Sequence, residues 1–146
     1  KDNKKYKIIL KKIKTNIIVL LFYVVDVFIW LLINIMPSKF IIKIFTERKA
    51  FYNILRVYKS YFISKIILAF KKREYHSFLF TSCLSRSITT KLFFNFVGRK
   101  INLNLGFTKL DNGTKEPHAW LSDPLTGKNI FKNKLNKDQV KLITYK

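Results

Sequence analysis

Residues 82–87 have the sequence Ser-Cys-Leu-Ser-Arg-Ser, and this stretch decides how the rest of the chain is interpreted. Ser82 is a favourable N-cap residue, and apolar residues follow it at helical spacing. Gly98 stands where a helix commonly ends, because glycine tolerates a positive φ. The pattern therefore predicts a helix over residues 83–97, with Cys83 in its first turn.

A cysteine in the first turn of a helix is well placed for nucleophilic chemistry. Free backbone N–H groups and the positive end of the helix dipole favour the thiolate over the thiol, and the same N–H groups can hold the oxyanion of an acyl intermediate. Cys83 is also the single cysteine of the chain, as expected for a lone nucleophile in a reducing compartment. The structural alternative is a small buried apolar residue.

Beyond residue 101 the hydrophobic period changes to two, which predicts β-strands. Asn112 and Gly113 form a hairpin signal, so residues 117–122 should return as a strand that carries His118. A turn is predicted at residues 123–127, and further strands at 128–132 and 139–145. Helices followed by an antiparallel sheet make an α+β fold.

We expect Cys83 and His118 to meet in space as a thiolate–imidazolium pair. The imidazole would accept the thiol proton and later return it to a leaving amine. The structural alternative for His118 is a hydrogen-bonded core residue. His76 is a rival base, which we disfavour because its predicted loop fixes an imidazole poorly.

The chain contains three motifs: Cys83-Leu84-x-Arg86-Ser87, Leu105-Gly106-Phe107 and His118-Ala119-Trp120. Together they resemble a known family, the transglutaminase-like cysteine protease domain of lasso-peptide biosynthesis B proteins, of the microcin J25-processing type. The resemblance covers roughly residues 75–132 and implies a transglutaminase- or papain-like core with N-terminal helices packed on it. We expect a helical region at 1–72 and a protease core at 73–146, in one compact domain.

The resemblance implies a cytoplasmic cysteine peptidase that removes the leader from a ribosomally synthesised precursor peptide, without a cofactor or metal. Its implied partners are the precursor peptide, a separate leader-recognition protein and the ATP-dependent lasso cyclase. The sequence shows no leader-binding domain, zinc-ligand spacing or phosphate loop of its own. An acyl- or amide-transferring relative remains open, because hydrolysis and transfer share the thioester.

An orienting side chain on the second ring nitrogen normally completes a Cys–His pair. In the family this is an Asp on the strand after the histidine hairpin, and here that position is Ile130. We name the adjacent Asn129 as the third member, with Asp123 and Asn133 as other choices. Because the Asp is missing, a homologue of this family that binds peptide without cleaving it is an open alternative.

Two further side chains are candidates for substrate binding. Arg86 lies three residues after Cys83 and shares its helix face; it would bind a substrate carboxylate or carbonyl, or tie the helix to the sheet, and we favour the second. Trp120 shares a sheet face with His118, where it would shield the imidazolium, form a wall of the peptide cleft, or simply belong to the core.

The chain carries a formal charge of +21, from 29 basic and 8 acidic residues. Such a field attracts acidic peptides, anionic lipids and nucleic acid alike. We expect no nucleic-acid partner, because the basic residues are dispersed and no nucleic-acid-binding signature is present.

The first 36 residues raise a membrane alternative. Residues 1–15 form a basic amphipathic pattern, for which a solvated helix is favoured over a membrane-surface contact. Residues 16–36 are long and apolar enough to span a bilayer, but Asp26 lies at their centre. The alternative function is therefore a non-catalytic, membrane-associated basic helical adaptor. Helices are also predicted at 38–47 and 48–72, and a loop at 73–82.

Overall fold

The computed structural model describes residues 2–46, 59–75, 82–109, 112–131 and 139–145. These residues form a mixed α+β fold, as the sequence predicts. Its elements are α1 (Asp2–Ile35), α2 (Ser38–Thr46), α3 (Lys59–Tyr75), α4 (Cys83–Phe96), β1 (Asn102–Lys109), β2 (Lys115–Ser122) and β3 (Gln139–Tyr145).

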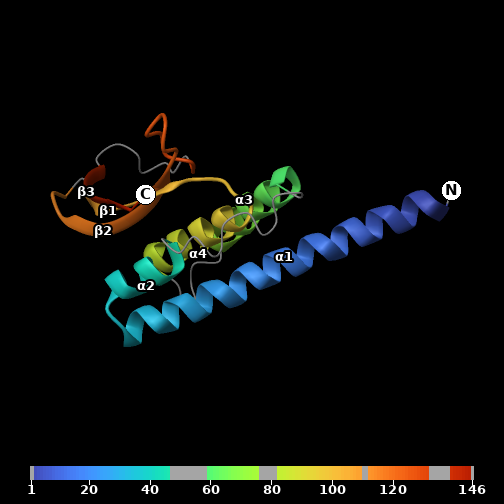
Figure 1. Ribbon diagram of the computed structural model, residues 1–146, viewed down its shortest axis with the longest axis horizontal. Helices are drawn as coiled ribbons and strands as arrows, with labels where there is room; N and C mark the ends of the chain where they lie inside the picture. The colour runs from blue at the N-terminus through green and yellow to red at the C-terminus, as the bar shows by residue number, and fades with distance from the viewer. Residues whose placement is uncertain (1, 47–58, 76–81, 110–111, 132–138, 146) are drawn as a thin grey trace.

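The elements form three layers. Helices α3 and α4 lie between α1 on one side and the sheet on the other (Figure 1). Helix α1 packs on α3 and α4, and α4 also packs on β2. Helix α4 is therefore the element that joins the N-terminal helices to the sheet.

The sheet is antiparallel, with strand order β2-β1-β3. In the hairpin between β1 and β2, Gly106 lies opposite His118 and Leu105 lies opposite Ala119. Gly113 has a φ of 79° in the connecting turn, a conformation that favours glycine. Among the described strands, β2 pairs only with β1, along one edge, and a bridge between Ser122 and Asn129 lies outside this sheet.

Both ends of α4 are fixed by local hydrogen bonds. At its start, the N–H of Ser85 donates to the Ser82 hydroxyl over 3.1 Å and the Ser85 hydroxyl accepts from the Ser82 N–H over 3.2 Å, a capping box. At its end, Gly98 has a φ of 69° and donates to Asn95, while Arg99 donates to the carbonyl of Phe94. This pair of bonds is a Schellman motif, so the predicted N-cap and terminating glycine are both confirmed.

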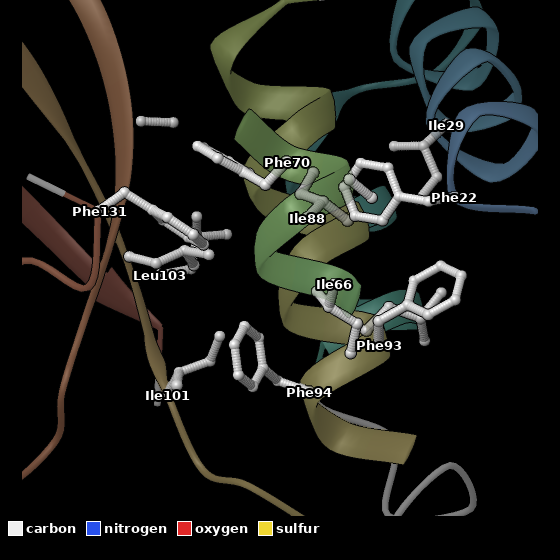
Figure 2. Close-up of a cluster of buried hydrophobic side chains, with 14 of the residues drawn as sticks. Phe22, Ile29, Ile66, Phe70, Ile88, Phe93, Phe94, Ile101, Leu103 and Phe131 are labelled. Atoms are coloured by element: carbon white, nitrogen blue, oxygen red, sulfur yellow. The ribbon is translucent and has the colours of Figure 1, made fainter. Parts of the chain in front are cut away.

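One hydrophobic cluster runs through all three layers (Figure 2). The rings of Phe70 and Phe131 stack with their centroids 3.8 Å apart and their planes 9° from parallel, which joins α3 to the segment after β2. The helices and the sheet therefore share a core. Its buried members in Figure 2 include Phe22, Ile29, Ile66, Ile88, Phe93, Phe94, Ile101 and Leu103.

The structure changes two helix boundaries. The basic and apolar patterns of residues 1–15 and 16–36 belong to one uninterrupted helix, which ends before Pro37. Helix α3 continues to Tyr75, three residues into the predicted loop. The first part of the helix predicted at 48–72 lies outside the described residues.

The strand predicted at 128–132 is corrected to an isolated bridge within its described part. Asn129 pairs with Ser122, and the N–H of Ile130 donates to the carbonyl of Leu121 over 2.9 Å. Immediately afterwards the Asn129 side chain accepts a hydrogen bond from the N–H of Phe131 over 3.1 Å. This local bond turns the backbone away from extended pairing.

Candidate active site at the start of helix α4

Cys83 is the first residue of α4, directly after its N-cap. Its side chain is half-buried, and its Sγ lies 4.0 Å from the carbonyl oxygen of Pro117 on β2. Pro117 immediately precedes His118 in the chain. The structure thus brings the sulfur beside the part of β2 that carries the candidate base.

A second contact fixes the same helix against the same strand. The hydroxyl of Ser87 donates to the carbonyl oxygen of Ala119 over 3.2 Å. Ser87 lies one turn after Cys83 on the same helix face, and Ala119 directly follows His118. The two contacts therefore hold the first two turns of α4 along β2, on both sides of His118.

These contacts lie along the edge of β2 that β1 does not occupy. Successive carbonyl groups alternate between the two edges of a strand, so residues 117, 119 and 121 point to the same edge. The first two contact Cys83 and Ser87, and the third accepts the Ile130 N–H. Side chains of α4 and one backbone donor thus take the place of a neighbouring strand.

Lys91 lies one helical turn after Ser87 on the same face of α4. Its side chain is 1% exposed, and its Nζ donates to the carbonyl oxygens of Ile101, over 2.9 Å, and Tyr145, over 3.0 Å. Sequence reasoning includes Ser87 in the first motif without giving it a role, and it misses Lys91. The available signal was their position four and eight residues after Cys83, which places all three on one face.

His118 is half-buried on β2, and its ring stacks on that of Trp120, with centroids 5.9 Å apart and planes 17° from parallel. Burial lowers the pKa of His118 below its usual 6.5. The positive charge of Arg86 lowers the pKa further, while Glu116 opposes the shift. Among the described residues, the Nε2 atom of His118 is buried without a hydrogen-bond partner.

The lowered pKa favours a neutral imidazole at physiological pH. This direction opposes the imidazolium half of the predicted resting ion pair. A neutral imidazole is instead suited to take a proton at the moment when the nucleophile attacks. The Trp120 ring stacks on the imidazole, and its predicted roles as a shield, a cleft wall or a core residue all stay predictions.

Arg86 contacts a core residue, and its charge also affects the pKa of His118. Its guanidinium carbon lies 5.9 Å from the centroid of the Phe70 ring on α3. Within the described part of the chain, its Nε is buried without a hydrogen-bond partner. The contact with Phe70 joins α4 to α3, so it leaves the favoured role of tying the helix to the sheet a prediction. The charge of Arg86 also acts on His118, as described above.

The structure does not bring Asn129 to His118. Asn129 pairs with Ser122, which lies four residues from His118 and hence about 13 Å away along an extended strand. Asp123 is engaged in the turn, where hydrogen bonds from the N–H groups of Thr126 and Leu125 lower its carboxyl pKa. The other two choices, Asn133 and His76, lie outside the described residues.

Neither a search for metal ligands nor a comparison with known proteins adds a residue to the candidate site. Across the ranges that the structure describes, no three His, Cys, Asp or Glu side chains come together as metal ligands would. No family model, curated protein or solved structure matches this chain.

Proposed function

We propose that the protein is a cysteine peptidase with Cys83 as its nucleophile and His118 as its general base. One observation carries the proposal: the Cys83 sulfur, at the first position of a capped helix, lies 4.0 Å from the carbonyl of the residue before His118. This contact supports the proposal because the thiol and the N–H groups at the start of α4 lie beside the strand that carries the imidazole.

The chemistry follows from these groups. The Cys83 sulfur forms a bond to the carbonyl carbon of the scissile peptide as its proton passes to the neutral imidazole of His118. Backbone N–H groups at the start of α4 stabilise the oxyanion. Collapse breaks the C–N bond, and His118 returns the proton to the departing amine. Water then hydrolyses the thioester, with His118 again accepting a proton.

The substrate class comes from the motifs shared with lasso-peptide biosynthesis B proteins. We propose that a ribosomally synthesised precursor peptide is cleaved after its leader in the cytoplasm. A separate leader-recognition protein would present the precursor, and a lasso cyclase would close the ring afterwards. The charge of +21 supports capture of acidic segments of the peptide or of these partners.

The test is a processing reaction followed by mass spectrometry. A precursor peptide encoded beside the gene is incubated with its leader-recognition protein and with native protein, Cys83→Ala or His118→Ala. Lys128→Ala, in the exposed turn after β2, is the control. We expect cleavage by the native and control proteins and none by the two site variants. Cleavage by Cys83→Ala at the native rate would refute the proposal.

A test without partners uses the single thiol. Iodoacetamide labels Cys83 alone, so the rate of alkylation reports directly on its environment. We expect His118→Ala to react more slowly than native protein at neutral pH, with unchanged circular dichroism. Equal rates would argue against a functional Cys83–His118 pair.

A second candidate function, the non-catalytic membrane-associated adaptor, is favoured by a different observation. Helix α1 has a segment, Thr15–Ile35, that is long and apolar enough to cross a membrane by length and composition, and only 28% of it is buried. A helix of this kind is either a membrane-contacting helix or part of a core. If this function holds, alkylation of Cys83 leaves the protein's membrane binding and partner recruitment unchanged.

A further inference from the structure

Helix α1 exposes a continuous line of large apolar side chains, called here the outer stripe. An α-helix has 3.6 residues per turn, and with this geometry the members of the stripe fall within an arc of about 100° around the helix axis. Each is between 47% and 79% exposed. The outer stripe consists of Ile13, Ile17, Leu20, Leu21, Val24, Phe28, Leu31 and Ile35.

The opposite face of α1 is the one that packs on the protein. Phe22, Asp26 and Ile29 are all fully buried there, toward the layer of α3 and α4. Figure 1 shows α1 at the border of the molecule, with the other helices on one side of it only. The outer stripe therefore faces away from the domain, and it is larger than an ordinary scatter of exposed apolar residues.

The charges around the outer stripe indicate what kind of surface it binds. In α1 the six lysines all precede Thr15, and no lysine or arginine occurs between Thr15 and Ile35. Beyond the stripe, Lys39 and Lys43 are exposed on α2. An apolar stripe with cations before and after it matches an anionic lipid surface, whose headgroups meet the cations while its acyl chains meet the stripe.

The same charges disfavour a second copy of the chain. A symmetric dimer through α1 would bring together two proteins that each carry a formal charge of +21. Their mutual repulsion opposes association, whereas an anionic surface is attracted by the same field.

We propose that α1 lies in the plane of an anionic membrane surface, with the outer stripe inserted among the acyl chains and the rest of the domain on the aqueous side. Asp26 does not oppose this arrangement, because it is buried on the protein-facing side of α1. Spanning the bilayer would instead require α1 to leave α3 and α4 and expose Asp26 to lipid, which is costly. Surface insertion keeps every packed contact of the helix.

The test is flotation of the full chain with vesicles. Vesicles of phosphatidylcholine alone are compared with vesicles that also contain phosphatidylglycerol. The variant Ile17→Gln/Leu20→Gln/Val24→Gln changes three outer-stripe residues that are 58%, 63% and 59% exposed, so the core is untouched. The control, Leu125→Gln/Leu142→Gln, changes two leucines that are 94% and 67% exposed elsewhere.

We expect native and control proteins to bind the anionic vesicles, to bind neutral vesicles more weakly, and to be released by alkaline carbonate. The triple variant should bind at least about a hundredfold more weakly. Native-like binding by that variant would overturn the proposal. Retention of the native protein on vesicles in carbonate would overturn the proposal in favour of a membrane span. If the native protein were a dimer in solution and the triple variant a monomer, the outer stripe would instead bind a second copy of the chain, which would also overturn it. Cys83→Ala should bind like native protein, so this result is independent of peptidase activity.

Discussion

The hydroxyl of Ser87 donates a hydrogen bond to the carbonyl oxygen of Ala119 over 3.2 Å, from the second turn of α4 to the outer edge of β2. Ser87 lies one turn after Cys83, and Ala119 follows His118. This bond therefore fixes the distance between the helix that carries the candidate nucleophile and the strand that carries the candidate base.

Replacing Ser87 with alanine should weaken both the fold and the site. The buried carbonyl of Ala119 would lose its donor, which costs about 1–3 kcal/mol of unfolding free energy. Alkylation of Cys83 should also slow, because the start of α4 would no longer be held at one distance from β2. Urea unfolding and iodoacetamide labelling measure the two effects. Ser64→Ala is the control, because that hydroxyl is exposed and bonds within α3 to Tyr61; identical behaviour of the two variants would contradict the prediction.

Lys91→Met should destabilise the protein although it removes a charge from a strongly basic chain. The Nζ of Lys91 donates to two backbone carbonyls, and methionine leaves both without that donor. We expect a loss of about 3 kcal/mol in unfolding free energy, on the scale of two hydrogen bonds to a charged group. Lys100→Met, at an exposed position, should change stability by less than about 0.5 kcal/mol. A smaller loss for Lys91→Met than for Lys100→Met in urea would refute this role.

The ends of elements could be predicted from the sequence because their causes are local. Ser82 and Gly98 lie at the two ends of α4, where short-range hydrogen bonds and one positive φ decide the outcome. The turn that begins at Asp123 is another case, since its carboxylate binds N–H groups two and three residues ahead. In each case the partners are within a few residues of the deciding side chain.

The contacts that position the site could not be predicted because their partners are distant in sequence. A lysine on a helix is normally solvated, and the acceptors of Lys91 lie 10 and 54 residues away. Asn129 is predicted beside His118 because it adjoins Ile130, the position at which the resemblance implies an Asp on a strand after the turn. Its side chain instead bonds to the N–H of Phe131, and the pairing ends after one bridge.

Gly106→Ala should disrupt the sheet at the position opposite His118. A Cβ at Gly106 would overlap the carbonyl oxygen of Val140 and lie 3.0 Å from Cη2 of Trp120. Because the first obstacle is backbone, β3 must move, and we expect a loss of about 3 kcal/mol or more in unfolding free energy. Gly127→Ala has open space but a φ of 67°, so it should cost only about 1 kcal/mol. Equal losses in urea would show that β3 relieves the overlap at little cost, because Gly106 is not among the glycines with a positive φ.

Stability should fall in mild acid because of His118. Its pKa in the folded protein is below the value of 6.5 in the unfolded chain, so the unfolded chain binds the proton more readily. The contribution of neutral His118 to the unfolding free energy is fully present above pH 6.5. It is lost as the pH falls through the lowered pKa of the folded protein. Urea midpoints between about pH 8 and about pH 5 should decline more for native protein than for His118→Gln. A decline of the same size in both proteins would place the acid sensitivity in other groups.

Arg86→Gln should raise the pKa of His118 toward 6.5, because it removes one of the two causes that lower it. Glu116→Gln should do the opposite, since the Glu116 carboxylate is the group that raises this pKa. The chain has two histidines, so the imidazole C2 proton signals can be assigned with His76→Gln and followed by NMR as the pH is varied. We expect the midpoints to fall in the order Arg86→Gln, native, Glu116→Gln, from high to low. If general-base catalysis by His118 operates, the acid limb of the peptidase rate should move in the same order, because only the neutral imidazole accepts the proton. An acid limb that stays fixed while the NMR midpoints move would assign proton transfer to a different group.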